Sequence, residues 1–126
     1  LGLGEVLNDT EPFKGLTATQ RTHLESYMDS DFAMDGQRFL KEGAKAERAY
    51  LVADGEVNIM KGDKKIVRVD ANTFVADVES LMSNGKYTFS AEAVGNVRLF
   101  MISRKALLDF VDLNPGFYFK LTEYDR

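Results

Sequence analysis

The sequence predicts a mainly β fold with flanking helices, in which antiparallel strands close into a sandwich or a roll. Turn-forming residues recur every few positions from residue 31 to residue 101, which is typical of many short antiparallel strands. Apolar residues with helical spacing lie before and after this region. The 126 residues suit one core, so we expect residues 1–126 to form a single domain.

The N-terminal part is predicted to be helical. Residues 4–8 form a short first segment that ends before Pro12. Thr17 and Gln20, three positions apart, have the spacing of a capping box at the start of a second helix. The apolar stripe of that helix comprises Leu24, Tyr27 and Met28.

The central part is predicted to contain hairpins. Residues 49–53 and 56–60 alternate in polarity on either side of Asp54-Gly55, a dipeptide that tolerates positive φ, so we expect two short strands joined at this point. A second turn at residues 61–64 leads into a strand at 65–69. The expected inward-facing residues are Phe32, Phe39, Val52, Val57, Ile66, Phe89, Leu99 and Met101.

The C-terminal part is predicted to be a strand followed by two helices. The strand covers residues 97–102, and Ser103 is placed to cap a helix over Lys105–Val111. Asn114-Pro115 ends that helix, with Pro115 at the first position of a final helix over Pro115–Asp125. Phe117, Leu121 and Tyr124 form its apolar face.

Composition argues against several classes of function. The chain has no cysteine, which excludes disulfides and thiolate zinc sites and fits a reducing compartment, so we expect a cytoplasmic location. No apolar run approaches the roughly 20 residues that span a bilayer. The net charge is −4, and the densest basic group, at residues 61–65, is interrupted by Asp63. We therefore expect neither membrane insertion nor nucleic-acid binding by this domain.

Catalytic machinery is also not evident. His23 is the only histidine, so a cupin-type metal enzyme, which needs two or three histidines in a similar β-roll, lacks its ligand set. No serine–histidine–acid arrangement is apparent either. We expect a non-catalytic domain with no metal and no cofactor.

Four segments together resemble the cyclic nucleotide-binding domain family. They are residues 13–16, 39–44, 49–57 and 96–104, and their order and spacing follow the family pattern over nearly the whole chain. The resemblance implies an eight-stranded antiparallel β-roll, also called a jelly roll or double-stranded β-helix, with an N-terminal helix and two C-terminal helices. It also implies a regulatory role with a cyclic nucleotide as the ligand.

The counterpart of the family's phosphate-binding cassette is residues 74–91, which we call the cassette segment. Binding members carry a phenylalanine-glycine-glutamate run, a one-turn helix and an arginine that clamps the phosphate. Here Ala76-Asp77 stand for glycine-glutamate, and Tyr87 falls at the arginine position. No arginine occurs between Val69 and Val97, so we expect weak or lost binding of cyclic AMP and cyclic GMP.

The candidate ligand-binding residues are Phe74, Ala76, Asp77, Glu79, Tyr87, Thr88, Phe89 and Ser90. Residues 76–79 and 89–92 are also similar to two runs of the Popeye-domain branch, which lacks the usual arginine. Alternatively, Asp77 and Glu79 start a short surface helix, Phe89 belongs to the core, and Tyr87 plugs an emptied pocket with its ring buried and its hydroxyl in water.

Two functions follow from the resemblance. The first is a regulatory module in which a cyclic nucleotide or another small anion repositions the C-terminal helices and so controls an effector domain of the same or another chain. The second is a scaffold without a ligand that serves as a docking or homodimerisation surface. The chain begins at Leu1 rather than methionine, so we expect it to be part of a longer protein.

Overall fold

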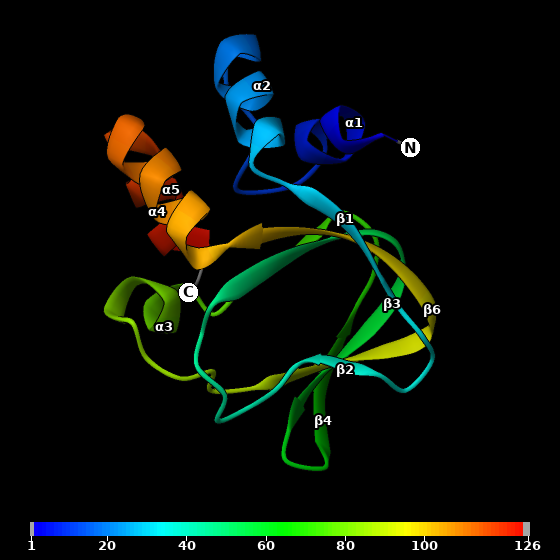
Figure 1. The fold of residues 1–126 in the computed structure, drawn as a ribbon. Helices are drawn as coiled ribbons and strands as arrows, with labels where there is room; N and C mark the ends of the chain where they lie inside the picture. The colour runs from blue at the N-terminus through cyan, green and yellow to red at the C-terminus, as the bar shows by residue number, and fades with distance from the viewer. Residues whose placement is uncertain (1, 125–126) are drawn as a thin grey trace.

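The computed structural model describes residues 2–124, which form five helices and a six-stranded antiparallel sheet (Figure 1). The helices are α1 (Leu3–Asn8), α2 (Ala18–Ser26), α3 (Val78–Ser83), α4 (Arg104–Leu113) and α5 (Pro115–Tyr124). The strands are β1 (Asp29–Ala33), β2 (Arg38–Leu40), β3 (Arg48–Lys61), β4 (Lys64–Val69), β5 (Thr73–Val75) and β6 (Ser90–Ser103).

The sheet is organised around β3 and β6. These two strands of 14 residues each pair antiparallel from Arg48↔Ser103 to Met60↔Ser90. Strands β1 and β2 pair with the free edge of β6, whereas β4 and β5 pair with the free edge of β3. The sheet curls into a roll, with α1, α2, α4 and α5 at one end and the hairpin of β3 and β4 projecting at the other (Figure 1).

The predicted fold class is confirmed, but the expected eight strands are six. The prediction of two short strands joined at Asp54-Gly55 is wrong, because β3 runs through this dipeptide without turning back. The register between β3 and β6 shifts here instead, which is a β-bulge. Gly55 has φ +107°, and a Cβ on it would lie 2.9 Å from the carbonyl oxygen of Asn96. Glycine therefore allows a bend in one long strand rather than a hairpin.

The predictions based on local signals are confirmed. The Thr17 hydroxyl accepts from the Gln20 amide at 3.1 Å, and the Gln20 side chain accepts from the Thr17 amide at 2.9 Å. Ser103 caps α4 by accepting from the Ala106 amide. Pro115 is the first residue of α5, which is described as far as Tyr124, so the predicted end at Asp125 lies outside the described residues. The turn at residues 61–64 joins β3 to β4.

An aromatic cluster ties the helices to the roll. The ring of Phe13 packs edge-on against Phe74 of β5 at 4.8 Å between centroids and is stacked with Phe117 of α5 at 5.7 Å. Phe117 in turn packs edge-on against Phe110 of α4. These four rings are all buried, so the N-terminal segment, β5 and both C-terminal helices share one core.

The prediction of an inward-facing side chain is wrong for two residues. Phe32 of β1 is 54% exposed because its neighbour Ala33 takes the inward position, and Ile66 is 53% exposed because five of the six residues of β4 are exposed. Val52, Val57 and Leu99 are buried as predicted. Phe39, Phe89 and Met101 are partly buried against the core.

Alanine in place of Gly55 should destabilise the fold more than alanine in place of Gly62. Gly62, with φ +58°, has open space within 4 Å of the point where a Cβ would lie, so Gly62→Ala costs only the left-handed backbone, about 1 kcal/mol. Gly55→Ala adds a clash with the Asn96 carbonyl, for a total of about 2–3 kcal/mol. Urea unfolding measures both values, and equal losses would show that the bulge does not require glycine.

Candidate functional site

The cassette segment leaves β5, forms α3 and rejoins the sheet at β6. All eight candidate residues lie on it, but they divide into two groups. Phe74, Ala76 and Phe89 line a cavity. The other five residues are not among the cavity's lining residues, and four of them hold the segment in shape through hydrogen bonds.

Asp77 organises the segment with a buried carboxylate. Its side chain is the N-cap of α3, with Oδ1 accepting from the Ser80 amide at 3.3 Å. Oδ2 accepts from both the amide and the hydroxyl of Thr88, each at 2.8 Å. The residue is only 5% exposed, so these bonds compensate for the loss of water around the charge. The prediction that Asp77 starts a short helix is confirmed, although the residue is buried.

Tyr87 fastens the segment to the beginning of β3. Its hydroxyl accepts from the Arg48 amide at 2.9 Å and from the Glu47 amide, and it donates to the Arg48 carbonyl at 2.8 Å. The ring is buried, as the plug interpretation expects. The expectation that the hydroxyl lies in water is wrong, because the backbone of residues 47–48 satisfies it.

Ser90 helps to hold the cassette segment in place, whereas Glu79 lies on its surface. Ser90 is buried, and its hydroxyl accepts from the Glu42 amide at 2.9 Å. Glu79 is exposed in the first turn of α3, as the helix-start interpretation predicts. Lys86, the one cation within the sequence of the cassette segment, is exposed and forms an isolated β-bridge with Lys45.

A cavity of about 460 Å³ lies between the hairpin of β3 and β4, strand β5, and Phe89. Its lining residues are Ile59, Val67, Val69, Thr73, Phe74, Val75, Ala76, Phe89 and Tyr124. None of these carries a charged side chain. Sequence reasoning missed the contribution of β4, although the alternation of residues 65–69 was the available signal, and it missed Tyr124 entirely.

The two C-terminal helices hold the cassette segment at two points. The Tyr124 hydroxyl of α5 donates to the Phe74 carbonyl at 2.6 Å and accepts from the Phe74 amide at 3.2 Å. Arg104, the first residue of α4, donates through Nε to the Leu81 carbonyl of α3 at 2.6 Å. The backbone beside the cavity is therefore bonded directly to α5, and α3 is bonded directly to α4.

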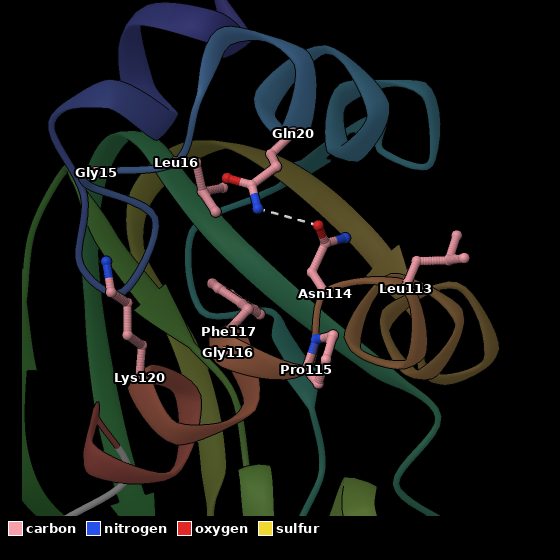
Figure 2. A pocket seen from close by; sticks show the side chains of 9 residues that line it. All are labelled: Gly15, Leu16, Gln20, Leu113, Asn114, Pro115, Gly116, Phe117 and Lys120. Atoms are coloured by element: carbon pink, nitrogen blue, oxygen red, sulfur yellow. Dashed lines mark hydrogen bonds between the residues drawn. The ribbon is translucent and has the colours of Figure 1, made fainter.

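A second cavity, of about 410 Å³, lies where α4 meets α5 (Figure 2). The side chains of Gln20 of α2 and Asn114 of the helix junction point toward each other across it, and Gln20 Nε2 donates to Asn114 Oδ1 at 3.0 Å. The Lys120 ammonium group reaches the Lys14 carbonyl at 3.5 Å. The junction of α4 and α5 is thus also tied to the N-terminal helices.

Residues 2–124 contain neither a metal-binding cluster nor a helix that could span a membrane. No cluster of three or more histidine and acidic side chains there is arranged to hold a metal ion. None of the described helices has the length and apolarity needed to cross a membrane.

Comparison with known proteins gives a family match and a shared fold. A family model described as "Cyclic nucleotide-binding domain" matches residues 32–114, which include the whole cassette segment. The sensor domain of the transcriptional regulator DNR from Pseudomonas aeruginosa aligns with a TM-score of 0.79 and 23% identity, covering 95% of this chain and 88% of that one. None of the curated proteins compared with this chain matches it.

Two further solved structures have the same fold within longer chains. The C-linker/CNBHD of zELK channels, crystallized in the presence of cAMP, aligns with a TM-score of 0.79 and 18% identity over 93% of this chain. The cAMP-bound PfPKA-R aligns with a TM-score of 0.82 and 16% identity over 97% of this chain. This chain spans 60% and 43% of the length of those two.

Replacing Asp77 should destabilise the domain, whereas replacing its exposed neighbour Glu79 should not. Asp77→Asn replaces one of the two acceptor oxygens with an NH2 donor, so either the Ser80 amide or the two donors of Thr88 lose their acceptor, at a cost of about 1–3 kcal/mol. Glu79→Gln should change the free energy of unfolding by less than about 0.5 kcal/mol. Chemical denaturation tests both, and an Asp77→Asn variant as stable as Glu79→Gln would contradict the structural role.

Stability should fall in alkaline solution because of two tyrosines. Burial raises the pKa of Tyr87 and of Tyr124 above the ordinary value of 10.0. The unfolded chain therefore ionises first, and stability is lost as pH rises above about 10 toward the folded-state pKa values. Thermal unfolding from pH 8 to pH 11, in wild type and in a Tyr87→Phe/Tyr124→Phe variant, should show a shallower decline in the variant. The exposed Tyr118→Phe serves as the control that keeps the wild-type slope.

Proposed function

This chain belongs to the cyclic nucleotide-binding domain family, and we propose that it is a non-catalytic regulatory domain whose cavity is coupled to α4 and α5. The observation that carries the proposal is the pair of hydrogen bonds from Tyr124 to Phe74 and from Arg104 to Leu81. Both bonds join a C-terminal helix to the backbone of the cassette segment. A ligand that moves this backbone must break or distort them.

We further propose that the domain has lost tight binding of cyclic AMP and cyclic GMP. A charge-assisted hydrogen bond contributes roughly 1.5–3 kcal/mol, so loss of the clamping arginine weakens phosphate binding by at least about tenfold to a hundredfold. Tyr87, at the arginine position, is committed to the backbone of residues 47–48. The Ser80 amide of α3, a donor that could face an anion, is occupied by Asp77.

Asp77 is also committed within the cassette segment. The family's glutamate accepts a hydrogen bond from the ribose, but here both carboxylate oxygens of Asp77 already accept from Ser80 and Thr88. A ligand that relied on this acceptor would have to compete with the Ser80 and Thr88 donors for it.

The output of the domain is proposed to be an effector domain, of the same or another chain, that responds to α4 and α5. The fold is shared with the sensor domain of a transcriptional regulator and with a part of channel proteins, which is consistent with a module that serves different effectors. A docking or dimerisation surface is the second candidate function. Its support is the exposed apolar surface of the C-terminal helices, where Leu113 is 66% exposed and Phe119 is 67% exposed.

Hydrogen exchange tests the coupling. Tyr124→Phe removes the bond to the Phe74 carbonyl while retaining the ring, so exchange of residues 73–76 should rise severalfold together with that of α5. Tyr118→Phe, on the same helix but 41% exposed, should leave both segments unchanged. Micromolar cyclic AMP or cyclic GMP should not alter the wild-type pattern.

Two results would count against the proposal. Faster exchange in α5 alone, with residues 73–76 unaffected, would break the link between cavity and helix and favour the docking function. Protection of the cassette segment by micromolar cyclic nucleotide would show that tight binding survives without the arginine.

A further inference from the structure

We infer that the cavity beside the cassette segment binds an uncharged, mainly apolar small molecule rather than an anion. This inference rests on the proposed function, in which the same cavity is the regulatory site. It concerns the chemical class of the ligand, and three features of the cavity support it: the lining, the surrounding charge and the size.

The lining is mainly apolar. Ile59 and Val67 come from the hairpin of β3 and β4, and Phe89 from the end of the cassette segment. Among the described residues that line it, Thr73 and Tyr124 are the two with a polar side-chain group. The Tyr124 hydroxyl already donates to and accepts from the backbone of Phe74. The Thr73 hydroxyl is the remaining polar group, and it can serve one polar atom of a ligand.

The charges around the cavity disfavour an anion. A charged group moved from water into an apolar site without a partner loses several kcal/mol. No cation is among the described residues that line this cavity, so an anion would find no ionic partner on them. An uncharged ligand has no such penalty and gains about 25 cal/mol for each Å² of apolar surface that it covers.

The size is that of a small-molecule site. A volume of about 460 Å³ falls within the usual range for ligand pockets, about 300–1,000 Å³. The two phenylalanine rings and Val67 can contact a flat or aliphatic molecule over its faces. Val67 is 49% exposed, and a ligand in the cavity would cover this unprotected apolar surface.

Two adjacent residues of β4 provide a matched test. Val67 lines the cavity, whereas Ile66 does not, because successive side chains of a strand point to opposite faces. Both are about half exposed, so an aspartate at either position should leave the core intact. Nile red, an uncharged dye that fluoresces in apolar surroundings, is the probe. Thermal unfolding of both variants confirms that they are folded.

Nile red should bind wild type and Ile66→Asp with similar, saturable affinity, and Val67→Asp at least about tenfold more weakly. Cyclic AMP should not displace the dye below millimolar concentration. Absence of saturable binding to wild type would overturn the inference, as would equal binding to the two aspartate variants. Displacement by micromolar cyclic AMP would also overturn it, because the cavity would then accept an anion.

Hydrogen exchange in the presence of the dye separates this inference from the proposed function. If Nile red binds in the cavity and the hydrogen-exchange rate of α5 changes, both the ligand class and the regulatory coupling are supported. If the dye binds as expected and α5 does not respond, the ligand class stands and the regulatory coupling fails.

Discussion

The antiparallel pairing of β3 with β6 determines the position of every other strand, because each of them pairs with one of these two. The bulge at Gly55 bends β3 where the roll must curve. At one end of the pair Met60 lies opposite Ser90, and β5 pairs with β3 around Leu51↔Phe74. The cassette segment therefore has to cross from the outer edge of β3 to the start of β6. Its course, and the cavity that it borders, follow from this pairing.

By the family resemblance, Asp77 stands at the position of the glutamate that accepts from the ribose of a ligand, but here its carboxylate is used within the cassette segment. The amides of Ser80 and Thr88 and the Thr88 hydroxyl all donate to Asp77, so the loop is satisfied without an external anion. This arrangement explains how the shape of the family's site persists without the arginine. The Asp77, Thr88, Tyr87 and Ser90 side chains all have hydrogen-bond partners within the segment or on residues 42–48, and none of the four lines the cavity, whose lining is mainly apolar.

Sequence reasoning succeeded where the signal is local and failed where it depends on distant partners. The caps of α2 and α4 and the Pro115 helix start are set by residues a few positions apart, and they were predicted correctly. Asp54-Gly55 suits a hairpin or a bulge equally well, and only the pairing of β3 with β6 decides between them. Alternation in β1 and β4 could not reveal that Phe32 and Ile66 lie on outermost strands. The sequence shows that no arginine lies between Val69 and Val97. It could not predict that the Tyr87 hydroxyl bonds to the backbone of Arg48, about 40 residues away.

The free energy that holds the C-terminal helices to the cassette segment is small enough for a weakly bound ligand to offset in the proposed switch. Each hydrogen bond from Arg104 or Tyr124 to the cassette segment contributes a net of about 0.5–1.5 kcal/mol, or more for the charged guanidinium. A ligand shifts an equilibrium only by the difference in its affinity for the two arrangements. Covering about 100 Å² more apolar surface in one arrangement supplies about 2.5 kcal/mol, which is comparable to the two bonds together. If the cavity is the regulatory site, as proposed, burial of this much apolar surface by an uncharged ligand is enough to offset the bonds that hold α4 and α5 to the cassette segment, without a clamping arginine.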